Sequence, residues 1–161
     1  MELLKALELI REDVSVRDAK LCFSLSRMAV IDGRTAKGKL KETNLPFEGF
    51  MEALCRLSVV KALPTDEELA RLQCPDAGVF MQRLLSSDFD DQTMDEFDPN
   101  VFFAERGADW GETPRQPMHR CLSHTIACII RAVEAESRGE DDLQITRKEA
   151  QLWAKDHLKP R

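Results

Sequence analysis

The spacing of the apolar residues is the feature that most constrains the fold of this 161-residue chain. Through most of the sequence these residues recur at steps of three and four, which places them on one side of an α-helix. No stretch shows the alternation that a half-buried strand requires, and no motif repeats at a fixed period. The sequence therefore predicts an all-α fold, a compact domain of several helices.

Helix starts are marked by hydroxyl residues that are followed three positions later by an acid. Ser15 with Asp18, Thr65 with Glu68, and Thr146 with Glu149 have the spacing of a capping box, in which each side chain bonds the other residue's backbone N–H. The apolar stripes, and the helix-breaking residues that follow them, then give the expected length of each helix. Helices are expected over 2–12 and 16–31, from Pro46 to just before Pro64, from Thr65 to about Gln73, over 75–87 and 116–137, and after Thr146, with a helical turn near Val101–Glu105. The helix over 16–31 is apolar on most sides, which is typical of a central core helix.

Composition limits the classes of partner. The net charge is −6, so the chain lacks the concentrated basic face that binding to nucleic acid or to an anionic membrane surface needs. No run of about 18 apolar residues is present, and the first residues indicate an amphipathic helix rather than a signal peptide. The five cysteines are scattered and odd in number, which favours buried thiols in a reduced compartment. We expect a cytoplasmic protein with no nucleic-acid or membrane partner.

The histidines and cysteines offer no clear catalytic or metal site. Cys121, His124 and Cys128 share a helix face, but a straight helix spreads them over about 10 Å, whereas zinc ligands converge at about 2.3 Å from one ion. A nucleophile pair of Cys55 or Cys74 with a histidine lacks any surrounding signature, and no phosphate-binding loop or hydrolase motif occurs. We therefore expect no cofactor, no metal and no enzymatic activity.

The stretch from Leu45 to Phe50 follows the pattern at the end of an EF-hand loop, with an apolar residue at loop position 8 and Phe at positions 10 and 13. In that frame Gly38 is position 1, and Glu42 at position 5 is the only carboxylate at a ligand position. Gly49 occupies position 12, where calcium needs a bidentate acid. We expect this loop not to bind calcium. The residues that would pack the following helix or line a groove are Leu45, Phe47, Phe50, Leu54 and Leu57.

The stretch that starts at Phe47 resembles the EF-hand-like segments of ciliary and flagellar proteins. The resemblance covers about one sixth of the chain and is carried by Phe47, Phe50, Glu52, Ala53, Leu54, Arg56 and Leu57. It implies EF-hand-like helix-loop-helix elements and a structural role in the axoneme, with axonemal or microtubule-associated protein partners. Taken alone, the same residues also fit an ordinary amphipathic helix that follows a basic loop.

Two charged segments are further candidates for partner contacts. The acidic one, which starts no complete calcium loop at Asp88 or Asp90, is compatible with a solvated loop and with a segment that folds onto a partner. Its residues are Asp88, Phe89, Asp90, Asp91, Asp95, Glu96 and Phe97. The basic one is compatible with simple solvation and with contact to an acidic surface such as that of tubulin. Its residues are Arg34, Lys37, Lys39 and Lys41.

The chain divides into three predicted parts. An EF-hand-like helical lobe covers 1–87, an acidic irregular connection covers 88–115, and a helical pair over 116–161 packs on the same core. The leading functional hypothesis is a non-catalytic adaptor or structural protein of the cytoplasm, cilium or flagellum. The alternatives are a calcium-regulated sensor with an unrecognised site and a thiol- or metal-dependent enzyme.

Overall fold

A computed structural model describes residues 2–27, 34–36, 38–39, 44–89, 97–137 and 144–158. Within these residues the chain forms eight α-helices and no strand, which confirms the predicted all-α class. The helices are α1 (Glu2–Ala6), α2 (Val16–Leu25), α4 (Phe47–Val60), α5 (Asp66–Arg71), α6 (Ala77–Ser86), α8 (Pro99–Arg106), α9 (Met118–Ser137) and α10 (Arg147–His157). EF-hand-like elements are not confirmed. The helix α2 ends well before Gly38, the first position of the predicted loop, and much of the chain between α2 and α4 lies outside the described residues.

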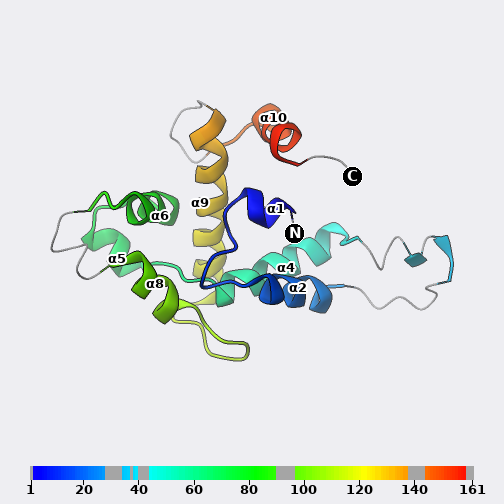
Figure 1. Cartoon of the computed structure of the whole chain (residues 1–161), viewed down its shortest axis with the longest axis horizontal. Helices are drawn as coiled ribbons and strands as arrows, with labels where there is room; N and C mark the ends of the chain where they lie inside the picture. Colours follow the sequence, from blue (N-terminus) through cyan, green and yellow to red (C-terminus); the bar gives the residue numbers. More distant parts are fainter. Residues whose placement is uncertain are drawn as a thin grey trace.

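The helix α9 runs through the middle of the molecule, with α5, α6 and α8 on one side and α1, α2 and α4 on the other (Figure 1). It packs against α4, α6 and α10. A separate apolar cluster lies on each side of it. We call them the aromatic cluster, on the α6 and α8 side, and the aliphatic cluster, on the α1, α2 and α4 side. No helix within the described residues combines the length and hydropathy that crossing a membrane requires.

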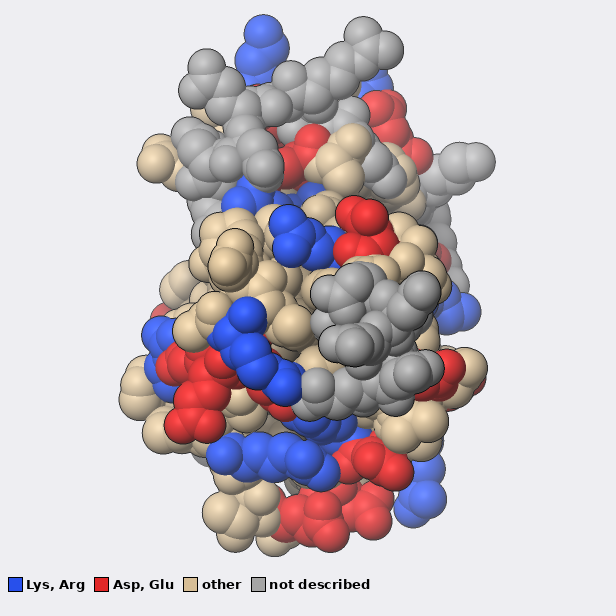
Figure 2. Space-filling model, turned by 90° about the vertical axis from the view of Figure 1, so that its left-hand side faces the viewer, with Lys and Arg blue, Asp and Glu red and all other residues tan. Residues whose placement is uncertain are grey.

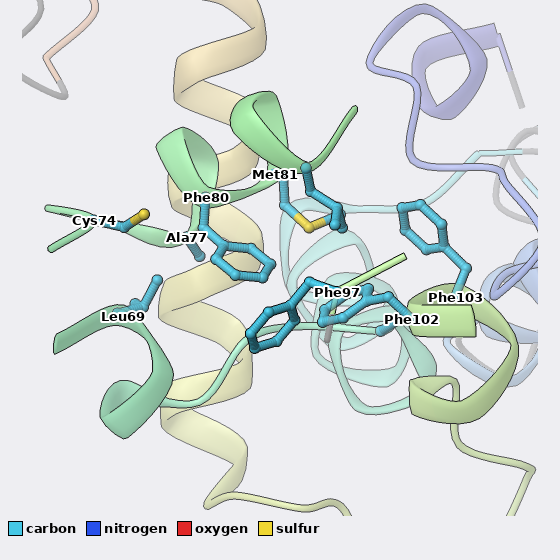
Figure 3. Packing of buried hydrophobic residues seen from close by; sticks show 10 residues of the cluster. Leu69, Cys74, Ala77, Phe80, Met81, Phe97, Phe102 and Phe103 are labelled. Atoms are coloured by element: carbon cyan, nitrogen blue, oxygen red, sulfur yellow. The ribbon is translucent and has the colours of Figure 1, made fainter. Parts of the chain in front are cut away.

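The aromatic cluster is built around Phe80 of α6, which is fully buried. Its ring centroid lies 5.6 Å from that of Phe97 and 5.5 Å from that of Phe102 (Figure 3). Separations of this size, with tilted or edge-on rings, are those that aromatic pairs prefer. Phe97 and Phe102 belong to the predicted irregular connection over 88–115, in which the helical turn expected near Val101–Glu105 is the somewhat longer helix α8. Asp98 caps this helix by accepting hydrogen bonds from two backbone N–H groups of its first turn.

The aliphatic cluster explains why α1 is shorter than predicted. Both Leu7 and Leu9 are buried in it, at 6% and 2% exposure. Residues two apart point to different faces of a helix, so one straight helix over 2–12 cannot bury both. The chain therefore leaves the helix at Glu8, whose φ is 51°, and the Leu9 N–H donates to the Leu4 carbonyl at 2.9 Å.

Three capping boxes form where the sequence predicts them, at the starts of α2, α5 and α10. In the last, the Thr146 N–H donates to Glu149 Oε2 at 2.7 Å, and the Glu149 N–H donates to Thr146 Oγ1 at 3.2 Å. Each box satisfies backbone donors that the helix itself leaves without partners.

Buried ion pairs, which the sequence did not reveal, connect distant parts of the chain. Arg131 of α9 donates from Nη2 to Asp76 Oδ2 at 2.7 Å and from Nη1 to Glu134 Oε2 at 3.0 Å. Lys61 Nζ lies 3.1 Å from Asp13 Oδ2, and both side chains are almost completely buried. Asp13 Oδ2 also accepts the Ala62 N–H at 2.9 Å, so this pair holds the segment before α2 against the end of α4.

The closest approach of α6 to α9 depends on Gly78. A Cβ added there would lie 2.4 Å from Arg131 Cγ and 2.8 Å from the backbone oxygen of Ala127. We predict that Gly78→Ala lowers the free energy of unfolding by about 1–3 kcal/mol, because the two helices must move apart.

Gly107→Ala is the matched control for this substitution. Its added Cβ would lie 3.4 Å from Asp13, an ordinary contact, and its φ of −61° suits alanine. We expect urea denaturation to show a change within about 0.5 kcal/mol. Equal effects of the two substitutions would mean that α6 and α9 are not tightly apposed at Gly78.

Candidate functional site

An apolar groove with a volume of about 860 Å³ opens between α1, α2 and α4. We call it the α2–α4 groove. Its volume lies within the usual range for binding pockets of proteins, about 300–1,000 Å³. It is lined by Glu2, Leu3, Leu4, Ala19, Lys20, Cys22, Phe23, Ser24, Leu45, Phe50, Ala53, Leu54, Leu57 and Leu158.

Helical periodicity places the groove on one face of α4. Phe50, Ala53, Leu54 and Leu57 follow steps of three and four, so their side chains lie along a single stripe. The start of α4 lies close to the end of α2, because a Cβ added at Gly49 would be 2.8 Å from the Ser26 backbone oxygen. This close approach brings the α2 residues and the α4 stripe into the walls of one groove.

Four of the five residues predicted as packing or groove anchors line this groove together. Leu54 and Leu57 are buried and belong also to the aliphatic cluster, whereas Leu45 is half-buried and Phe50 remains 40% exposed. Phe47 does not line the groove and is 73% exposed. The C-terminal part of the stripe thus packs in the core, whereas its N-terminal part faces solvent.

The acidic segment contributes to the protein's own core. Phe97 is 1% exposed within the aromatic cluster, so in this structure it is not available as an exposed docking residue. Phe89 is partly buried, with its ring centroid 5.7 Å from that of Phe80, and Asp88 is exposed. Asp90, Asp91, Asp95 and Glu96 lie outside the described residues.

The basic loop is described only in part. Arg34 and Lys39 are exposed, whereas Lys37 and Lys41 lie outside the described residues. The structure does not bring the two described cations to the lining of the groove.

The position of α2 differs from the predicted central one. Only Ala19 and Cys22 are buried among its residues, while Val16 and Leu25 are 40% and 55% exposed. On a second side of α2 lies an open hollow of about 420 Å³, lined by Val16, Arg17, Lys20, Leu21 and Ser24. The helix therefore sits at the edge of the fold, because α4 covers it while two hollows border it.

Buried thiols give the site little nucleophilic character. Burial raises the pKa of Cys22, which lines the groove, to about 11, and that of Cys128 to about 12. Burial likewise raises the pKa of the Cys74 and Cys121 thiols. These groups are protonated at neutral pH, and the thiol is a much weaker nucleophile than the thiolate.

Two of the three residues on the face of α9 that resembled a metal site, Cys121 and His124, have separate neighbours. The Cys121 thiol donates to the Gln116 backbone oxygen at 3.6 Å, and His124 Nε2 faces Asp66 Oδ1 at 3.1 Å. Burial lowers the pKa of His124, although Asp66 partly opposes this effect. In the part of the chain that the structure describes, no three His, Cys, Asp or Glu side chains are grouped closely enough to hold a metal ion.

A second cavity, of about 240 Å³, lies between α1, α6 and α9. Lys61 and Arg131 line it, but each is already bonded to buried carboxylates. On the side of the molecule formed around α5 and α6, positive and negative side chains are interspersed wherever the residues are described (Figure 2). Neither feature offers a binding surface comparable with the α2–α4 groove.

Comparisons with protein-family models, with curated proteins and with solved structures give no match to this chain. We therefore infer the function from the α2–α4 groove and from the sequence.

The different exposure of side chains along α4 leads us to a prediction about stability. Leu54→Ala removes a side chain that is 8% exposed and should lower the free energy of unfolding by about 2–5 kcal/mol. Phe47→Ser changes a side chain that is 73% exposed and should alter it by no more than about 0.5 kcal/mol. Urea denaturation followed by circular dichroism measures both. A cost for Phe47→Ser as large as that for Leu54→Ala would show that the chain itself covers Phe47.

Proposed function

We propose that this protein is a non-catalytic interaction module whose α2–α4 groove binds an amphipathic helix of a partner protein. The observation that supports this most is the groove itself, an apolar hollow of about 860 Å³ with Phe50 40% exposed on its α4 wall. Beside the lining residues in sequence, Leu25 and Phe47 are 55% and 73% exposed. Contiguous exposed apolar surface of this kind marks interaction sites in folded proteins.

The chemistry of the walls favours a helix over other peptide conformations. An extended peptide would need the free edge of a sheet, and the described residues contain no strand. A proline-rich ligand would need an aromatic-lined groove, and here Phe23 and Phe50 are the only aromatic lining residues. An amphipathic helix needs only a hydrophobic trough for apolar anchors at steps of three and four.

The same chemistry disfavours catalysis at this site. Cys22 is the one nucleophilic thiol in the lining, and its raised pKa keeps it protonated. The remaining polar side chains in the described part of the lining are Glu2, Lys20 and Ser24, with no histidine among them to act as a general base.

The setting that we propose is the axoneme of a cilium or flagellum, with an axonemal or microtubule-associated protein as the partner. The support for this is the resemblance of residues 47–57 to the EF-hand-like segments of ciliary and flagellar proteins. A fluorescently tagged chain should concentrate along the cilium in ciliated cells that naturally express it. A uniform cytoplasmic distribution in those cells would contradict this setting without affecting the groove.

The groove is tested with a synthetic 18-residue amphipathic helix that carries Leu and Phe on one face. The comparison peptide has the same composition with its apolar residues scattered. Of the two peptides, we expect only the amphipathic one to bind, as measured by fluorescence anisotropy. Its addition should also shift the amide resonances of α2 and α4. Ala53→Trp fills the groove with an indole and should weaken binding at least about tenfold, since it occupies the trough that the anchors need.

Ala70→Trp is the matched control, because Ala70 is exposed on α5, on the opposite side of α9. This variant should bind like the unmodified protein. Equal binding of the two peptides, or undiminished binding by Ala53→Trp, would contradict the proposed function.

A further inference from the structure

We infer that the helix bound by the α2–α4 groove is acidic along the edge that meets α2, with carboxylates that pair with Arg17 and Lys20. This inference rests on the proposed function and specifies the chemistry of the partner. It follows from the charges on α2 and from the way this helix separates two hollows.

The helix α2 forms a ridge between the α2–α4 groove and the open hollow beside it. Lys20 and Ser24 line both, so they stand on the crest of the ridge. Phe23 and Cys22 lie on the groove side, and Val16, Arg17 and Leu21 on the other. A helix seated in the groove therefore places one of its edges directly beside the crest.

Two cations stand at the ridge, Lys20 on its crest and Arg17 one turn earlier on the side of the open hollow. Arg17 and Lys20 are exposed, and their spacing of three residues puts them next to each other on the helix surface. Within the described residues, neither side chain forms an ion pair with a carboxylate. The two cations are thus the charges of α2 that a partner meets first.

Asp18, the acid of α2, forms its hydrogen bonds with Ser15 and Trp110, although its charge also acts on the neighbouring Arg17. Asp18 Oδ2 accepts the Ser15 N–H at 3.0 Å, and Asp18 Oδ1 accepts the Trp110 indole N–H at 3.1 Å. On α4, Glu48 and Glu52 stand two residues either side of Phe50, which places them on the helix face away from the groove. Glu52 also pairs with Arg56 at 2.6 Å. Among the residues that the structure describes, Glu2 is the one acid that lines the groove, and it belongs to the α1 wall.

Charge complementarity therefore selects the partner. Carboxylates on one edge of the helix gain attraction from Arg17 and Lys20, whereas lysines there are repelled. A second copy of this chain is a poorer occupant, because a symmetric contact through α2 would bring the same cations of both copies together. The occupant that fits these charges is an acidic amphipathic helix of a different protein.

The test uses three synthetic peptides that share one apolar face and differ only at the flanking positions, which carry Glu, Gln or Lys. The unmodified protein should bind them in the order Glu, Gln, Lys, with roughly a tenfold difference between the extremes at low salt, as expected for two exposed ion pairs. The difference should shrink in 0.5 M salt, because exposed charges are then screened. Fluorescence anisotropy measures all of these affinities.

The variant Arg17→Glu/Lys20→Glu should reverse the order of the peptides. Arg147→Glu/Lys148→Glu, which makes the same change in net charge at two exposed positions of α10, should keep the original order. A variant at α2 that keeps the original order would overturn the inference.

Failure of this inference is distinguishable from failure of the proposed function. If all three peptides bind equally and Ala53→Trp abolishes binding of each, the groove function stands and the acidic edge is overturned. If no peptide binds, both fail. Sedimentation analysis covers the other occupant: a dimer that Ala53→Trp dissociates would show that a second copy fills the groove, which also overturns the inference.

Discussion

The buried contact between Arg131 and Asp76 is the interaction on which the arrangement around α9 most depends. Asp76 caps the first turn of α6 by accepting the Val79 N–H at 3.0 Å, and its other oxygen accepts two hydrogen bonds from Arg131. The arginine stem passes over Gly78, where any side chain would obstruct it. One carboxylate therefore starts α6 and attaches it to α9. Removal of one partner from such a pair leaves an uncompensated buried charge, which generally costs about 3–5 kcal/mol.

This attachment divides the molecule into a closed side and an open side. On the closed side, the rings of Phe80, Phe97 and Phe102 pack against one another between α6 and α8. On the open side, the stripe of α4 is only partly covered by α1 and α2. Exposed apolar surface is unfavourable in water, so the closed side contributes stability that allows the open side to remain accessible.

The sequence predicted those features that depend on neighbouring residues. Capping boxes and the apolar stripe of α4 are local patterns, and the structure has them where they were expected. The pairs Lys61–Asp13 and Arg131–Asp76 join residues 48 and 55 positions apart, and local periodicity carries no information about them. The edge position of α2 was missed for the same reason: an apolar composition shows that a helix prefers to be covered, but not which of its sides has a neighbour.

The structure of α2 also links binding to local stability. This helix has ten residues, of which only Ala19 and Cys22 are buried, and isolated helices of that length are marginal in water. Its start is held by the Ser15–Asp18 capping box and by the Trp110 indole, and its end by the close approach of α4 at Gly49. Between these two ends the described residues leave α2 uncovered along both hollows. A helix bound in the groove would supply the missing neighbour on one side of α2. Part of its binding free energy would therefore appear as protection of α2 against local opening. Because α4 contributes to both the groove and the core, that protection would extend to the aliphatic cluster and from there to α9.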